Sequence, residues 1–423
     1  MNRWGSIAAM GLVGVIALTG CGRAEGGNSA ATSGDAIDDK PATGEVTIWA
    51  MGNEGEVLDQ LATAFEDENP DVTINVTAVP WDSAHDRIAT SIAGGETPDI
   101  SMLGTTWVGE FAATGALEPT PEGLVDEASF FEGSWSTAVV DDVAYGVPWY
   151  VDSRVLYYRT DLAEAAGVEA PTTWDEYKAF ALALKDGGAT SGVSLPPGGF
   201  DSWQYVAPLA WPAGGDILNE DGTEFTFDTP EWAEAFEFYK SFFEEGASEA
   251  VRLEGGEIEQ KFIDGSVGSF FSGPFHVGLL REQGGADFED KFAVAQVPGA
   301  DTRTSFTGGG NLAVFGDSEN RDASWKFVRW LSQPETQLEW YDISTDLPSV
   351  QAAFEDPIFA DDPYLSVFAE QLADSKAPPA IPTWAQVSAV IDQELEKVTR
   401  GDQSVEAALE AIQQQAETIG TGN

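Results

Sequence analysis

Residues 45–103 read EVTIWAMGNEGEVLDQLATAFEDENPDVTINVTAVPWDSAHDRIATSIAGGETPDISML, and the alternation within this stretch decides the fold. Three of its segments have the apolar and β-branched composition of strands: residues 45–51, 72–79 and 99–103. The segments between them carry apolar residues at helical spacing: Leu58, Leu61, Ala62 and Phe65, then Ala84, Ile88 and Ile92. This repeated order predicts an α/β fold whose mainly parallel sheet has helices on both faces.

Each predicted strand is followed by a loop at the edge of the sheet where ligands of α/β folds bind. The three loops are GNEGE at residues 52–56, PWD at 80–82 and GTTW at 104–107. They provide six candidate binding residues: Asn53, Glu54, Trp81, Asp82, Thr106 and Trp107. Two of the loops carry a tryptophan, which suits a ligand with an apolar face.

The remainder of the chain is long enough for a second α/β region, since about 380 residues follow residue 44. Residues 173–176 (TWDE) have capping-box spacing, and Thr229 with Pro230 has the form of another helix start. Four tryptophans fall in such helical patterns and are interpreted as packing residues: Trp174, Trp232, Trp325 and Trp330.

The first 20 residues have the layout of a secretory signal peptide. Residues 7–18 are apolar, but this run is shorter than the roughly 20 residues that span a bilayer. Residues 18–21 (LTGC) resemble the lipobox of bacterial lipoproteins, in which Cys21, the single cysteine, would carry the lipid. Residues 21–44 are small and polar and predict a flexible tether. We therefore expect a lipid-anchored body on the extracytoplasmic face of the cell membrane.

The chain is strongly acidic, with 72 Asp and Glu against 20 Lys and Arg and a net charge of −52. Such a surface repels nucleic acid and anionic lipid head groups, so neither is expected to bind the body. The acidity fits either a saline habitat or a compositional bias of the source, and it says little about the ligand.

Four motifs carry a resemblance to a known family. They are GVPWYVDSRVLYYRTDL at residues 146–162, PTTWDE at 171–176, SGPF at 272–275 and GGGNLAV at 308–314. In this order they resemble the interlobe crossover, the following helix start, the Gly-Pro-aromatic loop and the second crossover of extracellular solute-binding proteins for sugars. The resemblance extends from about residue 45 to the C-terminus, and its nearest subgroup binds α-glucosides, trehalose and related short oligosaccharides.

The resemblance implies a two-lobed, periplasmic-binding-protein-like (type II) α/β fold with an interlobe cleft and crossing hinge strands. Residues 45–153 and 307–343 would form the first lobe, and residues 154–306 and 344–423 the second. The family's function implies a monomer that binds a di- or trisaccharide and hands it to the permease of an ABC importer.

The motifs add a second set of candidate binding residues, and their chemistry suits a sugar. Aromatic rings cover the apolar faces of a sugar, whereas carboxylates and guanidinium groups bond its hydroxyls. The motifs provide Trp149, Asp152, Arg154, Phe275, Gly309, Gly310 and Asn311, and Trp384 joins the set because it is expected in a loop. Asp152 and Arg154 could instead form a structural ion pair at the hinge, and Trp203 and Trp211 are assigned to neither class.

Residues 308–313 (GGGNLA) also fit the loose G-x-G-x-x-A dinucleotide pattern. An apolar, strand-like run follows these glycines, whereas the nucleotide motif requires a helix start. We interpret them as a crossover where glycine backbone approaches the ligand. His85 and His276, the only histidines, give no zinc spacing, and we expect neither metal nor cofactor.

Two other functions remain open from the sequence. A secreted glycoside hydrolase would also place aromatic rings and carboxylates in a cleft, but it needs a specific carboxylate pair that no motif here marks. The chain has no G-x-S-x-G nucleophile motif. A sugar sensor that is not coupled to transport would share the fold.

Overall fold

The computed structural model describes residues 36–253, 256–285, 287–299 and 302–422, with only the backbone described at position 82. The expected signal peptide and Cys21 lie outside these residues. Within the described ranges, no helix has both the length and the apolar character that crossing a membrane requires.

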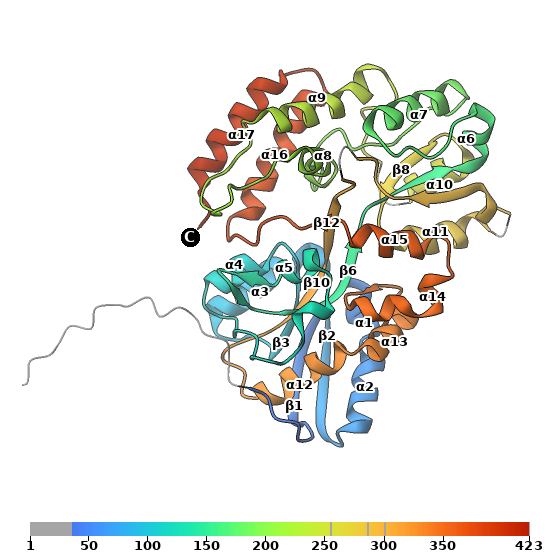
Figure 1. Ribbon diagram of the computed structural model, residues 1–423. Helices are drawn as coiled ribbons and strands as arrows, with labels where there is room; N and C mark the ends of the chain where they lie inside the picture. The colour runs from blue at the N-terminus through green and yellow to red at the C-terminus, as the bar shows by residue number, and fades with distance from the viewer. Residues whose placement is uncertain (1–35, 254–255, 286, 300–301, 423) are drawn as a thin grey trace, which may run out of the picture. The chain divides into compact units, whose positions relative to one another are not determined.

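The first lobe is built on a mixed sheet with the strand order β11-β6-β10-β3-β1-β2. Its strands are β1 (Thr43–Met51), β2 (Asp71–Val79), β3 (Ile100–Gly104), β6 (Val147–Ser153), β10 (Ser305–Val314) and β11 (Leu347–Pro348). Figure 1 labels five of these strands, β1, β2, β3, β6 and β10. β1 is parallel to β2 and β3, as expected. The other pairs are antiparallel, because β6 and β10 join this lobe to the second one and enter the sheet in opposite directions. The prediction of a mainly parallel sheet is therefore wrong beyond β3.

The helices of the first lobe follow the predicted stripes. Leu61, Ala62 and Phe65 are buried, and so are Ala84 and Ile88. The helices are α1 (Gly52–Val57), α2 (Asp59–Glu68), α3 (Trp81–Gly94), α4 (Val108–Ala113), α5 (Glu132–Ser136), α12 (Arg321–Leu331) and α13 (Pro334–Ser344). Short elements complete the lobe: β4 (Val139–Val140), β5 (Val143–Ala144), and the 3-10 turns η1 (Glu127–Ser129) and η4 (Gln351–Glu355).

The second lobe surrounds a three-stranded antiparallel sheet with the order β8-β7-β9. The strands are β7 (Val155–Arg159), β8 (Ser269–Ser272) and β9 (Phe292–Ala295), and β12 (Ser375–Lys376) pairs with the start of β10. The helices are α6 (Thr160–Ala166), α7 (Trp174–Asp186), α8 (Trp203–Ala210), α9 (Pro230–Glu244), α10 (Glu257–Asp264), α11 (Phe275–Gly284), α14 (Pro357–Ala360), α15 (Leu365–Leu372), α16 (Trp384–Thr399) and α17 (Val405–Ile419). Two 3-10 turns, η2 (Trp211–Ala213) and η3 (Glu289–Lys291), lie between them.

Local signals set several of these boundaries. Thr173 and Glu176 form the predicted capping box at the start of α7, and Pro230 begins α9. Trp203, Trp232 and Trp325 are each at most 1 % exposed and belong to the cores. Trp174 and Trp330 are half-buried and pack on phenylalanine rings.

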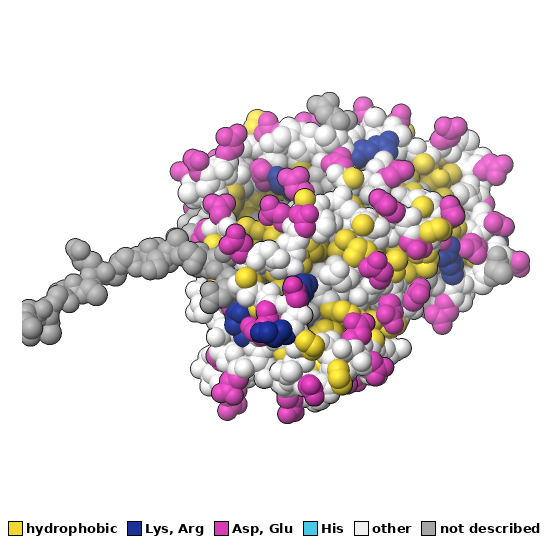
Figure 2. All heavy atoms as spheres, turned by 60° about the horizontal axis from the view of Figure 1, so that its bottom comes forward, with side chains coloured by type: hydrophobic (Ala, Val, Ile, Leu, Met, Phe, Trp, Pro, Cys, Tyr) yellow, Lys and Arg dark blue, Asp and Glu magenta, His cyan; other side chains and the backbone are white. Residues whose placement is uncertain are grey.

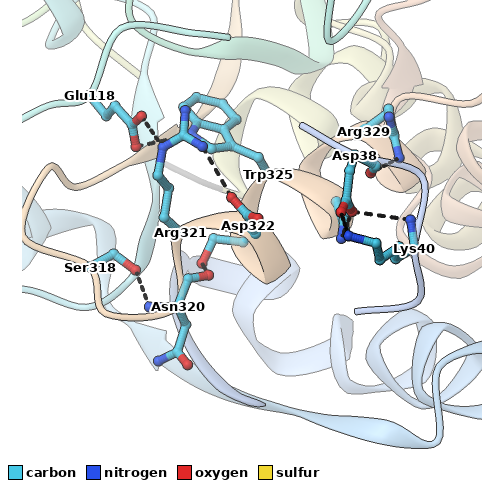
Figure 3. Close-up of polar contacts among 11 residues, drawn as sticks. Asp38, Lys40, Glu118, Ser318, Asn320, Arg321, Asp322, Trp325 and Arg329 are labelled. Carbon is cyan, nitrogen blue, oxygen red and sulfur yellow. Dashed lines mark hydrogen bonds and ion pairs between the residues drawn. The ribbon is translucent and has the colours of Figure 1, made fainter. Parts of the chain in front are cut away.

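The segment that leads into β1 is bonded to the body of the first lobe (Figure 3). The buried Lys326 amine on α12 lies 2.6 Å from an Asp38 carboxylate oxygen, and Arg329 reaches Asp39 at 3.2 Å. Ala42 is 1 % exposed, and β1 already begins at Thr43. Residues 38–44, which we expect to belong to the tether, therefore pack on the lobe.

The C-terminal side of the first lobe also extends further than expected. β11 pairs with β6, and Val350 lies in the same core as β1 and β3. Residues 347–350, which the expected boundary gives to the second lobe, thus contact the first. Figure 2 shows acidic side chains scattered over the visible face, with few lysines and arginines.

Candidate functional site

The three loops predicted from the sequence meet at one edge of the first sheet. A Cβ atom placed on Gly52, directly after β1, would lie 2.8 Å from the Trp81 indole at the start of α3. The Trp81 ring meets that of Trp107 edge to face, with centroids 5.6 Å apart. Gly104 leaves room under Trp107, since a Cβ there would lie 3.3 Å from its ring. Gly52 and Gly104 thus allow two tryptophans to form one partly exposed aromatic platform.

Carboxylates adjoin this platform. The same hypothetical Cβ on Gly52 would lie 3.3 Å from a Glu54 carboxylate oxygen, so Glu54 and Trp81 converge on the same glycine. The Tyr150 hydroxyl of β6 donates to Glu54. Asp346, just before β11, interacts electrostatically with both of them. Three distant segments therefore supply one cluster of oxygen atoms, which we call the acidic wall (Glu54, Tyr150 and Asp346).

Burial dominates the electrostatics of the acidic wall. Loss of solvation raises the pKa of Glu54, and it raises the pKa of Asp346 well above the usual range with a further contribution from the charge of Glu54. The pKa of Tyr150 is also raised well above 10, first by burial and then by the charge of Glu54. A raised pKa favours the protonated, neutral form of each group. The acidic wall can therefore form hydrogen bonds with hydroxyl groups while fewer charges are buried away from water.

Asp152 and Arg154 mark the crossover between the lobes. They form an ion pair in which the Asp152 side chain is 23 % exposed and that of Arg154 is 18 % exposed. Arg154 also donates to Gln204 in α8 at 3.1 Å. A Cβ on Gly273 would overlap the Asp152 carboxylate, which shows how closely the Gly-Pro-Phe loop approaches this pair. Asp152 and Arg154 thus form the ion pair that the sequence left open as an alternative to ligand binding. Arg154 also lines a hollow.

That hollow, of about 600 Å³, lies in the second lobe. Its lining combines aromatic rings, guanidinium groups and buried polar groups, including Arg154, Tyr205, Arg252, Glu259, Phe271, Phe275 and His276. Phe275 is 48 % exposed. The loop before it is fixed by the Tyr157 hydroxyl of β7, which donates to the Gly273 carbonyl at 2.7 Å.

His276 packs against the Phe275 ring, beside the Gly-Pro-Phe loop. Their rings are 4.4 Å apart. Nδ1 of His276 lies 2.6 Å from the Ser272 hydroxyl, and Nε2 lies 3.3 Å from the buried Glu259. Burial lowers the pKa of His276 to about 4, so the imidazole is neutral at physiological pH.

Three predicted binding residues are core residues instead. Trp149 is 1 % exposed and stacks on Trp340 at 4.5 Å, and Trp384 is 1 % exposed and meets Trp203 edge to face at 4.9 Å. Asn311 is completely buried and donates to Thr137 at 2.9 Å. Their burial leaves no ring face or amide for a ligand, so we withdraw them from the candidate site.

The glycines of the second crossover serve close packing of strands. β10 continues through them as a strand, which contradicts a dinucleotide motif. Gly309 has φ +122°, and a Cβ there would overlap the Tyr150 carbonyl and lie 2.9 Å from Cα of Val151. A Cβ on Gly310 would lie 2.7 Å from the Tyr150 ring. Gly309 and Gly310 therefore place Tyr150 in the acidic wall.

Asn53 and Thr106 lie in the segments that carry the platform, directly after Gly52 and directly before Trp107. Asn53 is exposed on α1 and Thr106 is half-buried in the turn before α4. The side chain of Asp82 and the whole of Cys21 lie outside the described residues. Within the described ranges, no group of three or more His, Cys, Asp or Glu residues is arranged to hold a metal ion.

Sequence reasoning missed Tyr150, Asp346, Tyr205 and Arg252. For Tyr150 a signal existed: side chains alternate along a strand, so Tyr150 and Asp152, two positions apart in β6, share one face. Choosing Asp152 as a site residue should also have selected Tyr150. Asp346 gave no such signal, because only the pairing of β11 with β6 brings it to Glu54.

Comparisons with known proteins agree with this architecture. The model of the family "Bacterial extracellular solute-binding protein" matches residues 51–338. The chain is 25% identical over 393 residues to the maltotriose-binding protein of Pyrococcus abyssi, covering 88% of this chain and 82% of that protein.

Solved structures with the same two-lobed fold are similar over most of their length. The sugar-binding protein MalE from Xanthomonas citri is 31% identical, with a TM-score of 0.83 and coverage of 89% of this chain and 97% of that one. The cyclic alpha-maltosyl-1,6-maltose binding protein from Arthrobacter globiformis is 26% identical, with a TM-score of 0.78 and coverage of 89% and 99%. On the match of fold, family model and relatives, the chain belongs to the bacterial extracellular solute-binding protein family.

Proposed function

We propose that this protein binds a short oligosaccharide between its lobes, a di- or trisaccharide of the α-glucoside or trehalose-like type, and delivers it to the permease of an ABC importer. One observation carries the proposal: the Trp81–Trp107 platform meets the acidic wall at the carboxyl edge of the first sheet. Aromatic faces next to hydrogen-bond acceptors are what the two kinds of surface on a sugar ring require.

The second lobe offers groups of complementary chemistry. The hollow brings guanidinium donors (Arg154 and Arg252) together with a partly exposed phenylalanine. A ligand that contacts both lobes would stabilise the closed arrangement, because those contacts exist only when the lobes approach each other. Relatives named for maltotriose and for a cyclic maltosyl-maltose support a sugar of this class.

We propose binding without catalysis. A glycoside hydrolase needs one carboxylic acid and one carboxylate with opposed roles. The chain matches the family of bacterial extracellular solute-binding proteins, and its relatives are named for the sugars that they bind, which favours binding.

We further propose that the mature protein is a monomer that is held at the extracytoplasmic face of the membrane by a lipid on Cys21. The LTGC sequence at residues 18–21 supports this assignment. Replacing Cys21 by Ser should release the protein from the membrane fraction into the soluble extracytoplasmic fraction. Unchanged membrane association of the variant would contradict the lipid anchor.

Thermal-shift screening followed by calorimetry tests the binding function. Maltose, maltotriose, trehalose and diacetylchitobiose form a suitable panel, and a true ligand at 100 times its Kd adds about 2.7 kcal/mol of stability. The binding should saturate at one sugar per chain and leave the sugar chemically unchanged. Release of shorter sugars from the ligand would contradict the proposal.

The variant Trp107→Ala assigns the site. Because an anchoring tryptophan commonly contributes at least about 2 kcal/mol to binding, the Kd should rise by about thirtyfold or more. Trp174→Ala, which removes a half-buried tryptophan stacked on Phe238 in the second lobe, is the matched control. Equal affinities of the two variants would exclude the platform as the sugar site.

A further inference from the structure

Trp107 contacts a second ring of α3 besides Trp81. His85 lies one helical turn after Trp81, and residues four positions apart share a helix face. The His85 imidazole meets the Trp107 ring edge to face, with centroids 5.4 Å apart and an interplanar angle of 77°. Trp107 is thus contacted by both rings of this helix face.

The imidazole is itself held by α4, the helix that begins after Trp107. Nε2 of His85 lies 2.9 Å from a Glu110 carboxylate oxygen, and the imidazole packs on the Phe111 ring at 5.2 Å. Glu110 and Phe111 follow Trp107 by three and four residues, so they lie on the same side of the chain as Trp107. His85 therefore contacts both Trp107 and the first turn of the helix that follows Trp107.

This arrangement is not required by a buried core. The His85 side chain is 33% exposed and that of Glu110 is 35% exposed. A polar, half-exposed pair next to a binding platform contributes little to folding stability, as surface ion pairs in general do. It does remove rotational freedom from the tryptophan ring that it contacts.

We propose that His85, held by Glu110, is a positioning residue that fixes the angle of the Trp107 ring and thereby tunes affinity for the sugar. The inference rests on the proposed function, in which the sugar binds against the Trp81–Trp107 platform. His85 itself is not assigned a ligand contact. Its role is to reduce the entropy that Trp107 would lose when the sugar binds.

The mobility of the Trp107 ring makes the contact measurable. Glu110 from α4 lies 2.9 Å from the imidazole, and Asp86 from the same helix as His85 lies 3.8 Å from it. A ring that such a held imidazole contacts has less rotational freedom. The fluorescence anisotropy of Trp107, obtained as the difference between the wild type and Trp107→Phe, should therefore decay slowly in the sugar-free protein.

Three variants separate positioning from general stability. His85→Gln retains a hydrogen-bonding group near Glu110 but removes the ring, and Glu110→Gln retains an acceptor without charge. Asp86→Asn changes a charge on the same helix whose side chain is 97% exposed, and it serves as the control. His85→Gln should speed the decay of the Trp107 fluorescence anisotropy in the sugar-free protein, because the ring loses its contact with the imidazole. Asp86→Asn should retain the decay rate of the wild type.

Calorimetry with maltotriose, or with the strongest ligand of the panel, completes the test. His85→Gln should raise Kd roughly two- to tenfold, the range of one aromatic pair, and Glu110→Gln should raise it less. A Trp107 anisotropy that decays equally fast in the wild type and in His85→Gln would overturn the proposal, as would unchanged affinity. If the wild type binds no sugar of the panel, the proposed function fails, whereas the fluorescence test of positioning still stands.

Discussion

Glu54→Gln separates the binding function of the acidic wall from its role in folding. Glu54 is only 8 % exposed, and its neighbours are the Tyr150 hydroxyl and the carboxylate of Asp346. Glutamine has the same shape and still accepts the Tyr150 hydrogen bond through its amide oxygen. The substitution therefore removes a buried negative charge and one acceptor while the packing is retained.

The structure predicts opposite signs for affinity and stability. A hydrogen bond to a charged group contributes about 1.5–3 kcal/mol, so losing one should raise the Kd roughly ten- to hundredfold. Stability should instead increase. Burial raises the pKa of Glu54, so this carboxyl stabilises the fold below its unfolded pKa, and that stabilisation is lost as pH rises through the folded value. The free energy of unfolding gained with glutamine should therefore be larger at pH 8 than at pH 5.5.

Two assays and one control decide the outcome. Calorimetry with the panel's best ligand gives the affinity, and urea unfolding of the sugar-free protein at pH 8 and pH 5.5 gives the stability. Glu56→Gln is the matched control, because Glu56 is exposed on the same helix. Unchanged affinity in Glu54→Gln would remove Glu54 from the ligand contacts. A loss of stability that is equal at both pH values would refute the argument from burial.

Three further predictions concern the framework that holds the site. Gly309→Ala should lower the free energy of unfolding, measured in urea, by about 2–4 kcal/mol, because Gly309 has a positive φ and a Cβ there would overlap β6. Gly94→Ala is the control, because the space around Gly94 is open. Equal stabilities of the two variants would contradict the crowding at Gly309. Asp392 accepts hydrogen bonds from the loop before α8, and burial raises its pKa to about 6, so its stabilisation is lost as pH rises through about 6. Asp392→Ala should accordingly cost more stability at pH 5 than at pH 8, and equal costs in urea would refute this. Lys326→Met removes the partner of Asp38 and should speed limited proteolysis within residues 36–42, whereas an unchanged digestion rate would show that the segment is held by other contacts.

The elements that could be predicted from the sequence are those whose signal is local. Helical stripes such as Leu61–Phe65 and the capping box at Thr173 depend on neighbours along the chain, and the structure contains them. The loops after β1, β2 and β3 converge because parallel strands end at the same edge of a sheet. The platform of Trp81 and Trp107 was therefore within reach of sequence reasoning.

The parts that could not be predicted depend on pairing between distant strands. The acidic wall needs β11 beside β6, an antiparallel pairing between segments almost 200 residues apart. Trp384 was expected in a loop, but it begins α16, where contact with Trp203 buries it. Trp149 could not be placed by strand alternation, because the register between β6 and β10 shifts at this residue.

A crystal structure of the protein with the panel's strongest ligand tests the central claim most directly. The account predicts one intact oligosaccharide, with a ring against Trp81 or Trp107, hydroxyls bonded to Glu54 or Asp346, and Phe275 of the second lobe in contact with the same molecule. A sugar bound elsewhere on the surface, or a cleaved sugar in the cleft, would contradict it.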